Sequence, residues 1–201
     1  MKRQEFFNTA AVTWDKHFQT QELLYFLEHL MSELDLGPGE KILDVGTGTG
    51  VLIPFLLKAV GQTGHVTAID YAEKMVELFR AKYAGFPNVS IAVQQVEKLR
   101  FSSESFDAIT CFGLFPHLEN KRKALRQMNR VLKHDGRLII AHALSSTEIR
   151  NHHHNASSAI AHDMLPDDAT MRELLKRAGF DQISIIDKPG RYLCLSVKSS
   201  M

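Results

Sequence analysis

Apolar residues recur every third or fourth position between Thr20 and Leu36, and polar residues fill the positions between them. This period places the apolar side chains on one stripe of a helix, where they can be buried against a core. The stripe consists of Leu23, Leu27, Leu30 and Leu34. We expect a helix over this stretch that stops at the glycine and proline residues which follow it.

Beyond this helix the pattern alternates between short apolar runs and helical periods. Strands that helices cover on both faces appear in a sequence as nearly continuous apolar runs. The predicted strands are 41–45, 65–69, 89–93, 106–112 and 137–142, and the predicted helices between them are 51–60, 72–83 and 120–132. This order predicts a doubly wound, Rossmann-like α/β sheet with right-handed crossovers.

The end of the chain departs from that alternation. A predicted helix, 168–178, precedes two strands, 180–186 and 192–197, which only residues 187–191 separate. Parallel strands need a crossover of about a dozen residues or more, whereas antiparallel strands can be joined by a short turn. We therefore predict a seven-stranded, mostly parallel sheet that finishes in a C-terminal antiparallel hairpin.

Composition limits the class of protein. A chain of 201 residues with 44% hydrophobic content can bury one substantial core, which predicts a single domain. Lys and Arg number 24 against 23 Asp and Glu, so no strong field draws in a nucleic acid or an anionic membrane.

Cysteine usage and apolar runs bear on location. Cys111 and Cys194 are far apart, stand in apolar stretches and lack CxxC spacing, as expected in a reducing compartment. Residues 1–10 lack the apolar core of a signal peptide. The longest apolar run, 51–60, is about half of the roughly 20 residues that cross a bilayer. We expect a cytoplasmic protein without a membrane span.

The first predicted strand runs into a glycine-rich turn with the sequence DVGTGTG, residues 44–50. Such a turn between a strand and a helix presents backbone amides and a positive helix end to an open crevice. Gly46 permits the sharp bend, and Gly48 leaves room for a ligand near the backbone. Asp70 ends the second strand 26 residues after Asp44, where a carboxylate can accept hydrogen bonds from both hydroxyls of a ribose.

The stretch ILDVGTGTG closely resembles the first motif of the class I S-adenosylmethionine-dependent methyltransferases. The resemblance continues through VTAID, SFDAIT and RVLKHDGRLII, covers Lys41–Ala143, and is greatest to the branch of the ubiquinone and menaquinone biosynthesis methyltransferases. It implies an enzyme that takes S-adenosyl-L-methionine as its cofactor and methylates a small molecule. The domain would then consist of a helical cover (1–36), a cofactor-binding core (37–143), a substrate-side loop (144–166) and a final helix with hairpin (167–201).

The resemblance assigns cofactor-binding residues by position. Gly46, Thr47 and Gly48 would line the amino-acid part of the cofactor, with Asp44 beneath it. Asp70 would hold the ribose.

For the remainder of the cofactor, Tyr71 would pack on the adenine. Where the family often has an aspartate for the adenine amino group, this chain has Gln95, whose amide oxygen can still accept, and the Val96 backbone amide can serve the ring instead. Cys111 and Phe112 would offer backbone carbonyls to the cofactor's ammonium group, or else belong only to the strand core.

Two other functions remain as alternatives: a protein that senses S-adenosylmethionine without turnover, and an oxidoreductase that binds a dinucleotide. Dinucleotide folds prefer GxGxxG, whereas this chain has GxGxG. An acid two positions before the first glycine also suits a cationic amino-acid tail better than a diphosphate. The closing hairpin supports the same choice.

Histidines that follow the carboxyl ends of strands are the candidate catalytic residues, since ligands of open α/β sheets bind there. His117 and His142 can each orient or deprotonate an acceptor, or be hydrogen-bonded histidines without a catalytic role. The run His152–His154, followed by His162 and Asp163, can contact substrate, bind a metal or form a solvated loop. Three adjacent histidines cannot converge on one ion from a helix, and we predict no metal site.

Methyl transfer from a sulfonium depends mainly on alignment in a dry site. We expect the N-terminal aromatic residues Phe6, Phe7 and Trp14 to lie on helices over the cofactor.

The proline-containing motif of enzymes that methylate DNA amino groups is absent from 111–117, and Cys111 follows Thr110 rather than the proline of cytosine C5 enzymes. We predict a small, partly apolar acceptor, no nucleic-acid partner, and a monomer or homodimer.

Overall fold

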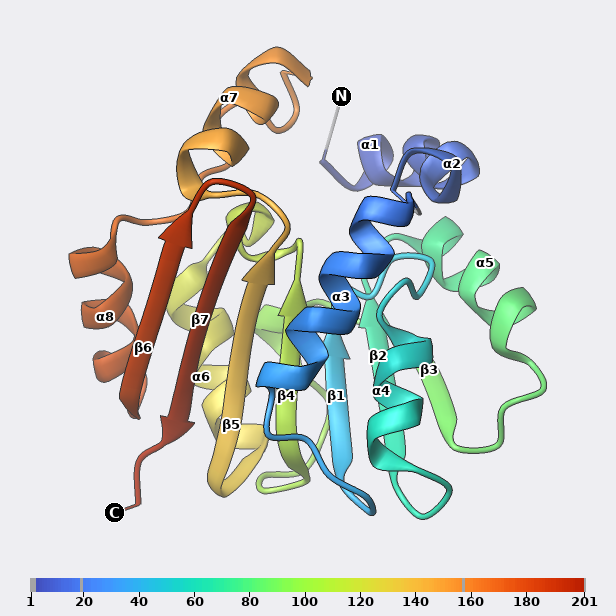
Figure 1. The fold of residues 1–201 in the computed structure, drawn as a ribbon, viewed down its shortest axis with the longest axis vertical. Helices are drawn as coiled ribbons and strands as arrows, with labels where there is room; N and C mark the ends of the chain where they lie inside the picture. Colours follow the sequence, from blue (N-terminus) through green and yellow to red (C-terminus); the bar gives the residue numbers. More distant parts are fainter. Residues whose placement is uncertain (1–2, 19, 157, 201) are drawn as a thin grey trace.

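The computed structural model describes residues 3–18, 20–156 and 158–200, which build a seven-stranded sheet with helices on both faces (Figure 1). The strands are β1 (Lys41–Val45), β2 (His65–Asp70), β3 (Val89–Val93), β4 (Phe106–Phe112), β5 (Leu132–His142), β6 (Phe180–Lys188) and β7 (Arg191–Lys198). Their order is β3-β2-β1-β4-β5-β7-β6. The first five run parallel, and β7 is antiparallel to both β5 and β6. The predicted fold class, hairpin included, is confirmed.

Two hydrophobic clusters lie on opposite faces of the sheet. Helices α3 (Gln21–Glu33), α4 (Ile53–Val60) and α5 (Glu73–Tyr83) bury apolar residues on one face. Helices α6 (Lys121–Val131) and α8 (Asp168–Arg177) do so on the other. Because both faces are covered, β1 has four fully buried positions in a row, as its sequence predicts. No helix in the described part of the chain is long and apolar enough to span a bilayer.

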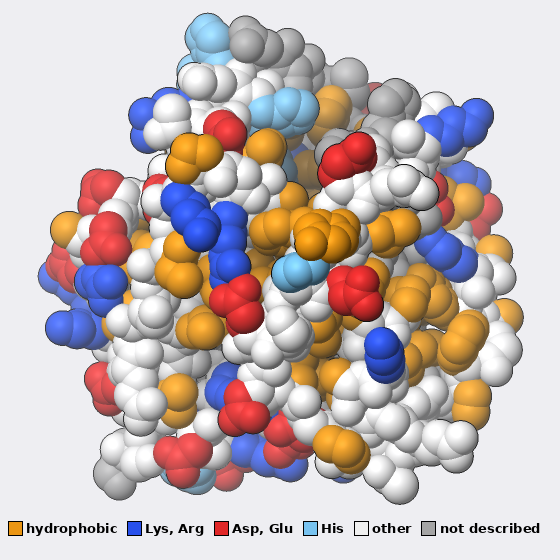
Figure 2. Space-filling model, viewed as in Figure 1, with side chains coloured by type: hydrophobic (Ala, Val, Ile, Leu, Met, Phe, Trp, Pro, Cys, Tyr) orange, Lys and Arg blue, Asp and Glu red, His pale blue; other side chains and the backbone are white. Residues whose placement is uncertain are grey.

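Helix α3 shows how local sequence sets an element. Its N-cap, Thr20, accepts a hydrogen bond from the backbone N–H of Leu23 at 3.2 Å. Leu27 and Leu30 of the predicted stripe are buried against the sheet. The outer face of the helix keeps Leu24 and Tyr25 exposed, and Figure 2 shows hydrophobic side chains gathered over this part of the molecule.

Three further helical segments lie beyond the carboxyl ends of the parallel strands: α1 (Arg3–Ala10), α2 (Trp14–Phe18) and α7 (Ser146–Ala156) (Figure 1). The expectation of N-terminal helices is confirmed. For 144–166, however, the prediction of a loop is wrong over the eleven residues of α7. Polar residues dominate α7, so no apolar stripe marks it. Ser145 and Glu148 nevertheless form a capping box, in which the Ser145 N–H donates to Glu148 at 2.8 Å and the Glu148 N–H donates to Ser145 Oγ at 3.3 Å.

Candidate active site

A cavity of about 660 Å³ opens at the carboxyl ends of β1, β2, β4 and β5. One residue at or near the end of each of these strands lines it: Asp44, Asp70, Phe112 and His142. Helices α1, α2, α3 and α7 supply much of the rest of the enclosure, together with the glycine turn, α5 and the segments that follow β2, β4 and β5. The volume lies within the roughly 300–1,000 Å³ of small-molecule sites, and the position is where open α/β sheets bind ligands.

The glycine turn forms the floor of the cavity. Gly46 has a φ of 69° and its N–H donates to the carbonyl of Ile69 at 2.8 Å, so the turn is pinned to β2. Gly48 has a φ of 56°, and a Cβ there would lie 3.5 Å from Nε1 of Trp14. Thr47 between them also lines the cavity and is 7% exposed. Backbone atoms of the turn therefore face the ligand space, as glycine permits.

Asp70 lies beside that turn with its carboxylate in the cavity wall. Its Oδ2 accepts from the Gly48 N–H at 2.9 Å, and its Oδ1 accepts from the Ala72 N–H at 2.8 Å. Burial raises the pKa of Asp70, against the effect of these backbone donors. An ionised carboxylate has about four lone-pair positions, which leaves capacity for two ligand hydroxyls.

Asp44 is the more deeply buried of the two carboxyl groups, with 2% exposure. Burial raises its pKa to about 6, although the Thr110 hydroxyl donates to its Oδ1 at 2.6 Å. Nearby Asp70 adds to the rise. A buried carboxylate with a raised pKa is a site that a cationic group stabilises.

The structure brings only some of the other predicted cofactor residues to the cavity. Tyr71 and Phe112 line it. Gln95 is exposed, while Val96 and Cys111 are buried, and none of these three belongs to the cavity lining. Burial raises the pKa of the Cys111 thiol, so it is held as a neutral core group. The adenine and ammonium roles of these three residues stay predictions.

Both predicted catalytic histidines line the cavity. His142 is 6% exposed, its Nε2 atom is buried without a hydrogen-bond partner, and burial lowers its pKa to about 3. His117 is held differently, because its Nδ1 lies 2.7 Å from Oδ2 of Asp163. His153 also lines the cavity, and its ring centroid is 4.8 Å from that of His117. His142 is therefore a neutral hydrogen-bonding group, and His117 belongs to a charged network.

Of the histidine run, His152 and the buried His153 line the cavity; His154 does not, and both His152 and His154 are exposed. The Nδ1 of His153 donates to the backbone carbonyl of Asp163 at 2.6 Å. Within the described residues, no group of three or more His, Cys, Asp or Glu side chains could hold a metal ion. His162 is exposed and lies outside the cavity lining.

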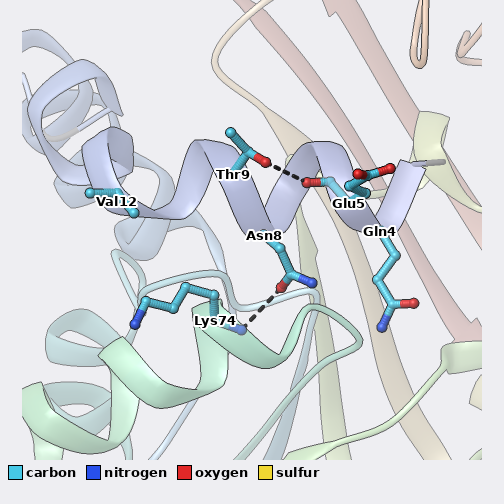
Figure 3. A pocket seen from close by; sticks show the side chains of 6 residues that line it. All are labelled: Gln4, Glu5, Asn8, Thr9, Val12 and Lys74. Atoms are coloured by element: carbon cyan, nitrogen blue, oxygen red, sulfur yellow. Dashed lines mark hydrogen bonds between the residues drawn. The ribbon is translucent and has the colours of Figure 1, made fainter. Parts of the chain in front are cut away.

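Helix α1 is fixed over the site by contacts with the segment that follows β2. The side chain of Gln4 donates to the carbonyl of Tyr71 at 2.8 Å. Asn8 accepts from the Lys74 N–H at 3.0 Å and so caps α5, whose own N-cap Ala72 has no side-chain acceptor. Figure 3 shows this contact in a second hollow, of about 450 Å³, between α1 and the start of α5.

Aromatic side chains join this cover to the site. The ring of Phe7 lies 5.9 Å from that of Trp14, 6.2 Å from that of Tyr71 and 5.1 Å from that of His117, each in an edge-on arrangement. Phe6 lines the same cavity. The sequence also places His17 beside this aromatic cluster, but the side chain of His17 lies outside what the structure describes.

Arg3 and Leu114 are among the residues that sequence reasoning missed. Arg3 reaches Asp163 across 160 positions of the chain, and no local motif indicates such a contact. Leu114 packs on the glycine turn, since a Cβ on Gly46 would lie 2.6 Å from its Cδ2 atom. The signal that existed for Leu114 was its place just after a strand that ends at the site.

Comparison with known proteins agrees with this geometry. Residues 42–136 match the family model described as a methyltransferase domain. A demethylmenaquinone methyltransferase of Staphylococcus aureus is 37% identical over 131 residues, a match that covers 62% of this chain and 54% of that protein. The matched part thus spans about half the length of this curated relative.

Solved structures extend the likeness over most of the chain. A SAM-dependent methyltransferase from Aquifex aeolicus aligns with a TM-score of 0.71 and 25% identity, covering 86% of this chain and 89% of that one. A chain of the complex between the Trm112 methyltransferase activator of Haloferax volcanii and a proposed methyltransferase aligns with a TM-score of 0.80 and 20% identity, covering 96% and 98%. The second likeness concerns the fold alone. The matched methyltransferase domain, the curated relative and the fold agree, and together they support a class I S-adenosylmethionine-dependent methyltransferase.

Proposed function

We propose that this protein transfers a methyl group from S-adenosyl-L-methionine to a small, largely apolar acceptor. The observation that carries the proposal is one continuous cavity with two kinds of wall. The glycine turn with Asp44 and Asp70 forms one wall, and apolar side chains with His117 and His142 form the other. Cofactor and acceptor would meet in the same enclosed space, as a displacement reaction requires.

The first wall fits the cofactor chemically. S-adenosyl-L-methionine, when bound, supplies a methyl group on a positively charged sulfur. Asp70 would accept hydrogen bonds from the ribose hydroxyls, and the open backbone of Gly46 and Gly48 would admit the amino-acid part. Asp44, buried with a raised pKa, would be stabilised by the ammonium group at that end. Tyr71 would border the adenine.

The second wall suits a flat or branched apolar molecule. Its aliphatic and aromatic members come from α1, α3, β4, α7 and the segments near them: Phe6, Phe7, Leu23, Phe26, Phe112, Leu114, Leu144, Ile149 and Ile160. His142 would orient the acceptor, because its Nε2 is unbonded and the low pKa keeps the ring neutral. His117 would take a proton from an acceptor that holds one.

A dry site favours methyl transfer over side reactions, and the cover provides it. Trp14 lies over the second glycine of the turn, and Phe7 links Trp14 to Tyr71 and His117. Cofactor and product would exchange by movement of α1 and α2, which form much of this side of the enclosure.

Cytoplasmic location and a monomeric or dimeric state belong to the same proposal. Cys111 and Cys194 are both buried and unpaired, as expected for a protein in a reducing compartment. The nearly balanced charge gives no reason to add a nucleic acid or membrane partner.

The test is turnover with methyl-labelled S-adenosylmethionine and a fractionated pool of small metabolites. We expect label in an organic-extractable product and release of S-adenosylhomocysteine. The Asp70→Asn variant should lose this activity, whereas Asp107→Asn, at the other end of the strands, should keep it. Cofactor binding without transfer to any fraction would favour the sensor, and binding of NAD alone would favour the oxidoreductase.

A further inference from the structure

Three separate parts of the chain meet at one carboxylate beside the cavity. Asp163, in the segment between α7 and α8, is only 6% exposed. Its Oδ2 lies 2.7 Å from Nδ1 of His117 and 2.9 Å from Nε of Arg3, and its Oδ1 lies 2.5 Å from Nη2 of Arg3. The N-terminal helix, the turn after β4 and the segment after α7 are thus joined by a single side chain.

The charge state of Asp163 follows from these partners. Burial alone would raise its pKa, but the hydrogen bonds from His117 and Arg3 outweigh burial and lower the pKa. Asp163 is therefore ionised and can only accept hydrogen bonds. Nδ1 of His117 must then carry the hydrogen in this contact. In the neutral ring the lone pair lies on Nε2, the nitrogen on the far side from Asp163.

We propose that Asp163 is the positioning residue that makes Nε2 of His117 the proton acceptor of this site, an inference that rests on the proposed function. Asp163 does not touch the reacting atoms. It fixes the ring's orientation and tautomer, as the carboxylate partner of a histidine base does in other enzymes. Arg3 engages both oxygens of Asp163, and His153 holds its backbone carbonyl at 2.6 Å, so the carboxylate is fixed from two sides.

The proton step balances within the site. The bond between the hydrogen and the atom to be methylated breaks, and its electron pair stays on that atom. A new N–H bond forms at Nε2 of His117. The ring becomes an imidazolium next to the Asp163 carboxylate, which stabilises the new charge. A base so arranged implies an acceptor whose methylated group carries a weakly acidic proton, such as a hydroxyl.

A purely structural role for Asp163 makes a different prediction. As a tie between α1 and the segment after α7, the ion pair with Arg3 would contribute to stability alone. Its removal would then lower the melting temperature without changing the tautomer of His117. The tautomer is therefore the observable that separates the two roles.

The experiment is nitrogen NMR of the full chain with labelled histidines, in complex with S-adenosylhomocysteine. The His117 signals are assigned by their loss in His117→Gln. We expect the hydrogen on Nδ1 in the wild type. In Asp163→Asn, Arg3 can only donate and should take the amide oxygen, so the amide NH₂ should face His117 and move the hydrogen to Nε2. Glu119→Gln, which alters the exposed partner 3.8 Å from Arg3, is the matched control and should keep the wild-type tautomer.

Each result decides the matter. Hydrogen on Nε2 in the wild type overturns the proposal even if the Asn variant fails to fold, and so does an Asp163→Asn protein that keeps the hydrogen on Nδ1. Methyl transfer to the labelled pool should fall about 10²–10⁴-fold in Asp163→Asn, the usual contribution of a proton-transfer group. Its affinity for S-adenosylhomocysteine should match that of the wild type. A wild-type protein that does not bind S-adenosylhomocysteine would instead refute the proposed function.

Discussion

The ionised carboxylate of Asp44 destabilises the folded protein unless a cation binds beside it. The change Asp44→Asn keeps the shape of the side chain and removes the ionisable group. Burial raises the pKa of Asp44 from 3.8 to about 6. This difference in pKa between the folded and unfolded states corresponds to about 3 kcal/mol of unfolding free energy. Solvent screening does not reduce it much, because the Asp44 side chain is almost wholly buried.

The sign of the effect follows from which state binds the proton. Between pH 4 and pH 6, approximately, the folded protein keeps the Asp44 proton and the unfolded chain has lost it. The unfolding free energy of the wild type therefore falls as pH rises through this window, and that of Asp44→Asn lacks this contribution. The Asn amide must find a new partner, at about 1–3 kcal/mol, so the net gain of the variant at neutral pH is smaller than 3 kcal/mol.

Urea denaturation of both proteins from pH 4 to pH 8, without cofactor, measures the effect. We expect the variant's stability relative to the wild type to increase by about 3 kcal/mol across the window and then level off. Asp107→Asn is the control with the opposite sign. Burial would raise the pKa of Asp107, but the hydrogen bonds from Lys133 and the Lys41 N–H, with the charges of Lys133 and Arg137, together lower it, so the stability that Asp107 contributes is lost as pH falls. A difference between wild type and Asp44→Asn that does not change with pH would refute the reasoning.

Two further predictions concern the turn and its cover. Trp14 is the only tryptophan of the chain and lies near Gly48, so its fluorescence should change on addition of S-adenosylhomocysteine; a spectrum that stays the same while calorimetry shows binding would place the ligand elsewhere. Gly50→Ala should be less stable than Gly61→Ala by about 1–3 kcal/mol in urea denaturation. Both positions have a positive φ, but only at Gly50 would a Cβ meet a packed ring, 2.5 Å from Cε2 of Tyr83; equal losses would show that the ring moves aside.

The sheet could be predicted because helices on both faces force its strands to be apolar. Strands β3 and β4 have the predicted bounds. Strand β5 begins at Leu132 rather than at the predicted residue 137. The sequence pattern did not reveal its first part because that part is mostly polar and pairs irregularly with β4, with a register shift between Phe106 and Ala108. Helix α7 was missed for a related reason, since capping and not an apolar stripe marks its start.

In the candidate site, too, the residues set by local sequence could be predicted and those held by distant segments could not. The glycine turn and Asp70 are local features, so their meeting follows from strand order alone. His117 was placed near the site in this way, but its partner could not be, because Asp163 lies 46 positions away on a different segment. Contacts of that kind depend on how α1 and the segment after α7 fold over the cavity, which no spacing in the sequence encodes.

The most direct test of the account is calorimetric titration of S-adenosylhomocysteine into the wild type, Asp70→Asn and the control Asp107→Asn. We predict binding to the wild type and to the control. For Asp70→Asn we predict a loss of at least about tenfold, or 1.4 kcal/mol, since the ribose loses its charged acceptor. Equal affinity in all three proteins, or heat on addition of NAD alone, would contradict the claim that the turn after β1 and the carboxylate at the end of β2 hold the cofactor.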